Sequence, residues 1–305
     1  MHWSPDRSLR RRMAIALALT VAGYVALLGP LFWILSTDAA LTVSAAVLVF
    51  VALVSVRADA VLGLVTAPIA VDEDDYPELV VTVDRLAAQA GVPRPHLALL
   101  PGHEANALSV GTGGRATICV TAGLVNDLDD EELEAVLAHE LSHLANGDST
   151  VMTVAGFPAA VATGLLTLAK RYFSGWAYLF GYVLALVPLV LVGVPLLLVS
   201  LPGTVALSRY REYAADRGAV ALTGDPAALV GALRTLHDAG LDTPGTDYRR
   251  LAGFGAFCFV PTGSTLLSLP STHPPADERI RRLDELAADL ERGRPSPGPS
   301  PDVGA

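Results

Sequence analysis

Three residues in this sequence are well suited to catalysis: His139, Glu140 and His143 form the pattern His-Glu-x-x-His. Histidines four positions apart lie on the same face of a helix, so both imidazoles can reach one tetrahedral metal ion. Glu140 then stands beside that ion, where a carboxylate can accept a proton from a metal-bound water. The pattern therefore predicts the chemistry of a zinc hydrolase.

The flanking sequence predicts the helix that this chemistry needs. Asp129 and Glu132 have the spacing of a capping box, the first turn is acidic, and Gly147 is a natural terminator. Leucines and a valine between them give the helix an apolar face to pack. The alternative is a surface His-Glu pair without metal, which is the expectation for His103-Glu104, a pair without ligand spacing in a solvated loop.

A second acidic pair supplies a candidate third ligand. Glu212 and Asp216 are four residues apart in a segment with helical propensity, so they share one face. A zinc hydrolase with two histidine ligands needs a third protein ligand and an open position for water, and Glu212 is the candidate. Asp216 can accept a hydrogen bond from a ligand histidine and so fix its tautomer. A solvated helix with charge pairs is the alternative.

The composition is typical of a membrane protein, with 52% hydrophobic residues, 17% charged residues and a mean hydropathy of +0.47. The net charge of -10 argues against nucleic acid as a partner, because a phosphate-binding protein shows a basic face. The two cysteines, Cys119 and Cys258, give no disulfide framework and are expected to be buried and inert.

Two apolar runs at the N-terminus predict a membrane hairpin. Residues 13–35 form an uncharged run of 23 residues, which at about 1.5 Å per residue spans a bilayer, and residues 39–56 can return the chain. A signal peptide is the competing interpretation, but its apolar core would be shorter. The arginines within residues 7–12 place this end in the cytoplasm by the positive-inside rule. Residues 58–71 extend the span or lie along the membrane.

A second hairpin is expected between the two metal-binding segments. Residues 151–169 and 176–207 are uncharged and apolar, and the second run contains three prolines that predict a kink. His139 and Glu212 can bind one ion only if the chain between them crosses the membrane an even number of times. Two spans satisfy this condition, and a buried soluble hairpin is the alternative. With two spans, the junction between Asp148 and Val151 places the metal within a few residues of the bilayer surface, so a substrate would be cut at or near the membrane.

The remaining segments predict a small soluble part. Residues 77–91 and 225–239 have helical patterns, with His237 in a structural role, and short strands are expected at 97–100, 106–110 and 116–121. The strands form a structural sheet, and a strand beside the metal helix can also pair with an extended peptide. His273, held between prolines and followed by a helix at 276–290, is either a surface residue or an active-site donor. Residues 293–305 are expected to be disordered.

Taken together, these motifs resemble the HtpX-like membrane-bound zinc metallopeptidases, gluzincins related to the CAAX prenyl proteases. The resemblance is carried by four segments: Ala135 to His143 with Asn146-Gly-Asp148, Ser208 to Asp216, Ser271-Thr-His-Pro-Pro275 with Glu278-Arg-Ile280, and Asn106-Ala-Leu-Ser. The last segment departs from the more usual Asn-Ala-Phe-Ala of the family's substrate strand. It marks Asn106, Ala107 and Leu108 as candidate substrate-binding residues.

The resemblance implies a mainly α integral membrane protein with about four transmembrane helices and a zincin-type catalytic domain carrying a small β-sheet. It implies one Zn²⁺ per subunit on His139, His143 and Glu212, Glu140 as the general base, and His273 near the cleft. The expected substrates are misfolded or damaged membrane proteins, cut on the cytoplasmic face of the cell membrane. A specific maturation or prenyl-protein peptidase and a non-catalytic membrane scaffold are the alternatives.

The expected organisation has five parts. An N-terminal hairpin and a second hairpin interrupt a catalytic domain that is split into two pieces, and a disordered tail follows. Their ranges are 1–71 for the first hairpin, 72–150 and 208–292 for the catalytic pieces, 151–207 for the second hairpin, and 293–305 for the tail.

Overall fold

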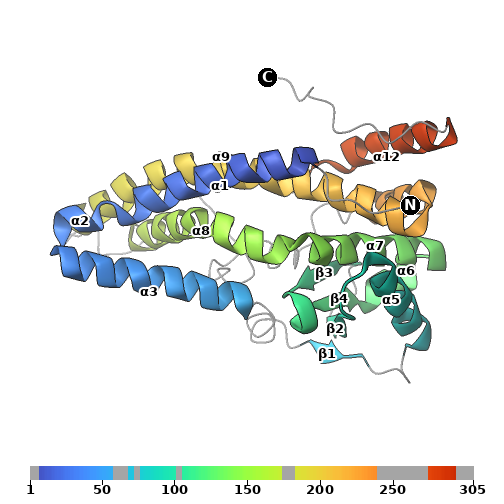
Figure 1. The fold of residues 1–305 in the computed structure, drawn as a ribbon. Helices are drawn as coiled ribbons and strands as arrows, with labels where there is room; N and C mark the ends of the chain where they lie inside the picture. Colours follow the sequence, from blue (N-terminus) through green and yellow to red (C-terminus); the bar gives the residue numbers. More distant parts are fainter. Residues whose placement is uncertain are drawn as a thin grey trace.

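The computed structural model describes residues 7–57, 68–71, 76–100, 105–173, 183–238 and 274–292. Within these ranges the molecule is elongated, with a purely helical end on the left of Figure 1 and a sheet packed against helices on the right. The expectations for residues 58–67, 103–104, 251–269, 273 and 293–305, and for Cys258, lie outside the described residues.

The N-terminal hairpin contains α1 (Arg7–Leu28), α2 (Leu31–Ile34) and α3 (Thr37–Val56). Within the apolar run at residues 13–35, which is predicted to span the bilayer, the helix breaks at Gly29-Pro30. Pro30 has no N–H to donate, and its ring would clash with the carbonyl of a preceding helical turn. The chain therefore restarts as the short α2 before it turns into α3.

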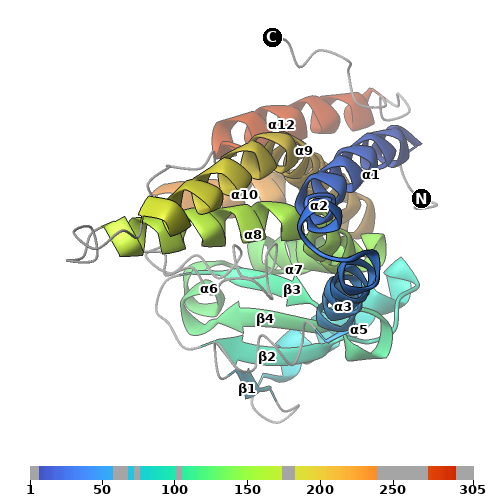
Figure 2. The same ribbon diagram turned by 90° about the vertical axis from the view of Figure 1, so that its left-hand side faces the viewer.

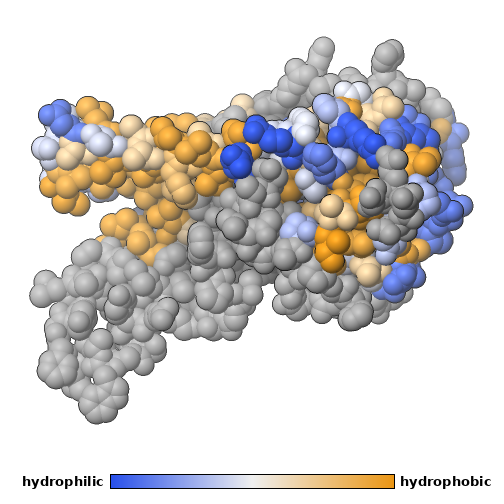
Figure 3. Space-filling view, turned by 90° about the horizontal axis from the view of Figure 1, so that it is seen from below, coloured by the Kyte–Doolittle hydropathy of each residue, from blue (hydrophilic) through white to orange (hydrophobic). Residues whose placement is uncertain are grey.

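Two long helices form the second helical pair, α8 (Asp148–Phe173) and α9 (Val183–Thr223). The helix α1 packs closely on α9, since a side chain on Gly203 would meet Leu19 at 3.0 Å. Figure 3 shows apolar residues over this helical end and hydrophilic residues gathered over the other end. Among the described residues, two helices are long and apolar enough to cross a membrane, Thr37–Val56 and Val190–Thr223, so the count of four spans is not confirmed.

The sheet has the strand order β1-β2-β4-β3. Its strands are β1 (Ile69–Ala70), β2 (His96–Leu100), β3 (Ala107–Val110) and β4 (Thr117–Thr121). β2 and β4 are parallel, whereas β1 and β3 run antiparallel to their neighbours. Figure 2 shows β3 at the edge of the sheet that lies next to the α7 and α8 layer. The small sheet predicted from sequence is therefore present, with β3 beside the metal helix.

Five further helices complete the described part of this end: α5 (Pro77–Ala90), α6 (Ala122–Asp127), α7 (Asp130–Asn146), α10 (Pro226–Asp238) and α12 (Ala276–Glu291). One face of the sheet packs with α5, α7, α10 and α12 in the main core, which includes Leu86, Ile118, Leu137 and Leu283. The opposite face carries a smaller cluster around Cys119. Burial, assisted by the nearby Glu140 carboxylate, raises the pKa of the Cys119 thiol to about 12, which keeps it protonated.

Candidate metal centre

The helix α7 begins and ends as its sequence predicts. Asp129 accepts a hydrogen bond from the Glu132 backbone while the Glu132 side chain accepts one from Asp129, which completes the capping box. The helix ends at Gly147 in the left-handed conformation, with φ of 70°. Its central turns are buried between β3, α5 and α9, which fixes the orientation of the side chains at positions 139, 140 and 143.

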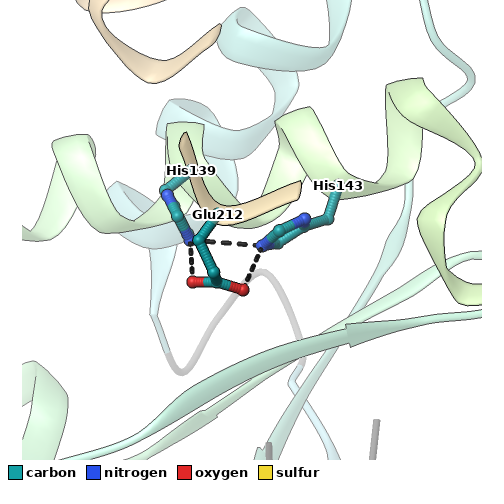
Figure 4. Close-up of side chains that lie close together, drawn as sticks. All are labelled: His139, His143 and Glu212. Atoms are coloured by element: carbon teal, nitrogen blue, oxygen red, sulfur yellow. Dashed lines mark hydrogen bonds and ion pairs between the residues drawn. The ribbon is translucent and has the colours of Figure 1, made fainter. Parts of the chain in front are cut away.

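His139, His143 and Glu212 meet in a buried group (Figure 4). The Nε2 atoms of the two histidines are 3.2 Å apart. The Glu212 carboxylate lies below them, with Oε2 3.6 Å from Nε2 of His139 and Oε1 3.5 Å from Nε2 of His143. Sequence reasoning grouped these three residues although Glu212 lies 69 positions after His143, and the fold brings them together.

These distances suit a tetrahedral metal ion. Zinc bound at about 2.0–2.2 Å by each ligand would separate neighbouring ligand atoms by roughly 3.3–3.6 Å. The two Nε2 atoms, 3.2 Å apart, have close to that spacing, and each lies 3.5–3.6 Å from one of the two oxygens of the Glu212 carboxylate. Two imidazole nitrogens and one carboxylate oxygen also form a donor set that leaves a fourth position for water. The side chains therefore fit a divalent metal.

Asp216 holds the other side of the His139 ring. Its Oδ1 lies 3.0 Å from Nδ1 of His139, and Arg279 pairs with both of its oxygens, through Nε at 3.0 Å and Nη2 at 2.5 Å. Although burial opposes ionisation of Asp216, Arg279 and His139 lower its pKa to about 2. Burial also disfavours the charged form of His139, but the hydrogen bonds to Asp216 and Glu212 raise its pKa overall.

Asp148 holds the His143 ring in the same way. Its Oδ2 lies 2.7 Å from Nδ1 of His143 and 3.1 Å from Nε of Arg211. The left-handed Gly147 makes this contact possible, because α8 starts directly after it and places Asp148 in a first helical turn beside α7. Each candidate ligand histidine thus has its own aspartate, which fixes the tautomer with Nε2 facing the site.

The charges of this cluster also favour the binding of a cation. Among the described residues, four buried carboxylates face two guanidinium groups, which gives an excess of two negative charges when the histidines are neutral. Such an excess is costly in a buried site unless a cation compensates it. A divalent metal ion neutralises the group, whose members are Glu140, Asp148, Glu212, Asp216, Arg211 and Arg279.

Glu140 lies on the side of α7 that faces β3. It is 3% exposed, and its Oε2 accepts a hydrogen bond of 2.9 Å from the hydroxyl of Ser109. Along β3 the side chains alternate between the two faces of the sheet. Ala107 and Ser109 therefore face α7, whereas Leu108 packs on the opposite face with Cys119.

The candidate substrate-binding residues thus occupy different environments. Asn106 is bound to β4 through its backbone, since its N–H donates to the Thr121 hydroxyl and its carbonyl accepts from the Thr121 N–H. Its side-chain nitrogen is buried and has no hydrogen-bond partner among the described residues. Leu108 points away from the metal helix, so only its backbone lies in the strand beside the site.

Sequence reasoning gave no role to four residues that the fold brings here. Arg279 is 63 positions from Asp216, and only its place in the Glu278-Arg-Ile280 motif marked it. Asp148 also stood in a quoted motif, directly after the helix terminator. Arg211 adjoins Glu212, and Ser109 is the residue that departs from the usual Asn-Ala-Phe-Ala pattern. Tertiary contacts give these residues their significance, and no local spacing does.

The fold and the buried site define a membrane metalloprotease. A model of the family described as Peptidase family M48 matches residues 74–287, and this chain belongs to that family. The match includes α7, the metal-binding part of α9 and most of α12. The resemblance to HtpX-like proteases seen in the motifs is confirmed.

Curated relatives agree with this assignment. Protease HtpX homolog 2 of Methanosarcina mazei is 33% identical over 293 residues, which cover 94% of this chain and 98% of that protein. Protease HtpX homolog 1 of Streptomyces coelicolor is 39% identical over 238 residues, covering 75% and 76% of the two chains. The likeness to the first relative extends over nearly the full length of both proteins.

A solved structure shares the fold. The crystal structure of S. mikatae Ste24p superposes with a TM-score of 0.51 at 20% sequence identity, and the match covers 89% of this chain. The chain corresponds to 64% of the length of that Ste24p chain. At this identity the likeness supports the architecture, in which apolar helices stand beside a small sheet and the metal helix.

Proposed function

We propose that this protein is a membrane-bound zinc endopeptidase that hydrolyses peptide bonds of misfolded or damaged membrane proteins. The observation that carries the proposal is the buried group of His139, His143 and Glu212, with the carboxylate of Glu140 on the same helix. Membership of the M48 family supports peptide hydrolysis as the reaction.

His139, His143 and Glu212 would hold the metal, and the nitrogen and oxygen donors with an open fourth position favour zinc. When bound, zinc supplies a Lewis acid that polarises a carbonyl and lowers the pKa of water. Asp216 and Asp148 hold the two imidazoles so that Nε2 of each ring faces the ion.

Glu140 is the proposed general base. Its carboxylate accepts a proton from the attacking water and then donates that proton to the leaving amine of the cleaved peptide. The hydroxyl of Ser109 donates a hydrogen bond to Oε2 of this carboxylate. His273, which Pro274 and Pro275 follow in the sequence, is a further candidate donor near the cleft.

The strand β3 is the proposed site of substrate binding. It is the edge strand of the described sheet and packs directly on α7. An extended peptide can add to such an edge through backbone hydrogen bonds, which brings its scissile bond close to the metal. Ala107 would line this edge through its backbone, and Asn106 and Leu108, whose backbone groups face β4, would lie beside it in the strand.

The proposed topology is a four-span membrane protein with the site in the cytoplasm. Its hairpins are residues 1–71 and 151–207, its catalytic pieces are 72–150 and 208–292, and its tail is 293–305. The positions of the arginines support this orientation, because the basic cluster in residues 7–12 and the pair Arg209 and Arg211 would share one side.

The test uses the full chain purified in detergent without chelators, with casein as substrate. The proposal expects cleavage that zinc restores after metal removal, and a loss of about 100- to 10,000-fold in rate for Glu140→Gln. Equal cleavage by the wild type and Glu140→Gln would refute the assignment of the base. Absence of cleavage by zinc-loaded wild type would favour a membrane scaffold over an enzyme.

A further inference from the structure

Ser109 is the one residue of β3 with a hydrogen bond between its side chain and the proposed general base, as far as the described residues show. Its hydroxyl donates to Oε2 of Glu140 at 2.9 Å, and both side chains are at least nine-tenths buried. The contact joins residues 31 positions apart on the two elements that border the site. Removing the hydroxyl would therefore take a hydrogen-bond donor away from a buried carboxylate.

The backbone of Ser109 points in a different direction from its side chain. The two backbone hydrogen bonds between Asn106 and Thr121 show that Asn106 faces β4. Backbone groups alternate in direction along an antiparallel pair, so Leu108 also faces β4 while Ser109 faces the outer edge of the sheet. The N–H and carbonyl of Ser109 are therefore directed to where an added peptide strand would lie.

The backbone and the side chain of Ser109 thus face two different parts of the site. A peptide that pairs with the edge of β3 would be bound by the backbone of Ser109, while the hydroxyl of the same residue holds the base. We propose that Ser109 is a positioning residue, which sets the orientation of the Glu140 carboxylate relative to a peptide bound along β3. This inference rests on the proposed function, because it requires both a peptide substrate and Glu140 as the base.

The proposal predicts an effect on turnover and not on binding. Ser109→Ala keeps the strand backbone, so the Michaelis constant is expected to stay within about twofold of wild type. It removes a hydrogen bond to a charged group, which corresponds to about a tenfold loss in kcat at the lower end of such contributions. Ser109→Thr keeps a hydroxyl on a residue type that strands accommodate, and should recover most of the lost rate.

The experiment measures kcat and KM of the zinc-loaded full chain on a fluorogenic peptide, together with bound zinc, for wild type, Ser109→Ala and Ser109→Thr. Ser200→Ala is the matched control. Ser200 is also buried, but its hydroxyl donates to the Leu196 carbonyl within α9, so its removal should leave kcat unchanged.

A selective fall in kcat for Ser109→Ala, with full zinc content and recovery in Ser109→Thr, would support the proposal. A wild-type kcat in Ser109→Ala would overturn the proposal. A kcat of Ser109→Thr as low as that of Ser109→Ala would also overturn it, and so would a loss of bound zinc in proportion to the loss of activity. The wild type and Glu140→Gln are measured in the same assay. Inactive wild type would count against the proposed function, whereas active wild type with an unaffected Ser109→Ala would count against this inference alone.

Discussion

His139 and His143 are each held by an aspartate that pairs with an arginine, but the two aspartates differ in their sequence distance from the histidine: Asp216 is 77 positions from His139, whereas Asp148 is 5 positions from His143. The distal pair, Asp216 and Arg279, joins α7 to α9 and to the C-terminal helix α12. The local pair, Asp148 and Arg211, joins the junction between α7 and α8 to α9.

The two pairs also differ in how completely the carboxylate is satisfied. Both carboxylate oxygens of Asp216 have partners. Arg279 forms a bidentate ion pair with them, and Oδ1 also lies next to Nδ1 of His139. In Asp148, Oδ2 serves both His143 and Arg211, while Oδ1 is buried without a hydrogen-bond partner among the described residues. The distal pair is therefore the more rigid one, and it makes α12 a part of the metal site.

The largest effect is expected from Arg279→Met, which removes the charge of the distal pair and keeps most of the side-chain volume. Asp216 would remain as a buried carboxylate without its cation, and breaking such a pair costs about 3–5 kcal/mol. Thermal unfolding of the zinc-loaded protein in detergent measures this loss. An unchanged unfolding temperature would show that the distal pair does not support the fold.

Neutralising the aspartates separates their effects on the metal. Asp216→Asn and Asp148→Asn are each expected to weaken zinc binding by about 10- to 100-fold, because the neighbouring histidine loses its charged acceptor. The loss should be larger for Asp216→Asn, since Arg279 then loses its bidentate partner and keeps the longer ion pair to Glu212 at 3.6 Å. Competition with a chelating dye gives both affinities. A greater loss for Asp148→Asn would reverse the ranking of the pairs.

A smaller effect is expected from Arg211→Met. The Arg211 side chain is 11% exposed and makes one ion pair of 3.1 Å to a single oxygen, so water can partly replace it. Because the Asp148 carboxylate then loses its arginine partner, the free energy of unfolding should fall by about 1–3 kcal/mol. Thermal unfolding of Arg211→Met and Arg279→Met, measured in parallel, tests this difference. Equal losses of stability in the two variants would remove the distinction between the pairs.

The smallest effect is expected from Arg281→Met, which lies on the same helix as Arg279 but on its exposed side. Arg281 pairs with Glu278 at 2.8 Å, and its side chain is 53% exposed. Water and salt screen exposed pairs of this kind, so the unfolding temperature should change little. A loss as large as that of Arg279→Met would mean that α12 tolerates no substitution, and the distal pair would have no special role.

The sequence predicted the parts of this site that depend on local spacing. The capping box, the Gly147 terminator and the shared face of Glu212 and Asp216 all follow from residues a few positions apart. Arg279 could not be placed in this way, because 140 positions separate it from His139 and only the tertiary fold brings α12 beside α7. The role of Ser109 likewise depends on which side chains of β3 face α7, because alternate residues of a strand point to opposite faces of the sheet.

The helices show a similar division. Apolar runs predicted where helices occur, but the run at residues 13–35 contains Gly29-Pro30, and the break there separates α1 from α2. In α9 the three prolines do not end the helix, which continues through the apolar part to Glu212 and Asp216. One continuous helix thus carries both the apolar segment and the candidate ligand, a link that hydropathy alone does not reveal.

The most direct test of the central claim is the zinc content of the purified full chain, measured by mass spectrometry for wild type, Glu140→Gln and Glu212→Ala. The account predicts about one zinc per chain in wild type and in Glu140→Gln, because Glu140 is not a ligand, and a large loss in Glu212→Ala. Full zinc content in Glu212→Ala, or none in wild type, would contradict a metal centre built from His139, His143 and Glu212.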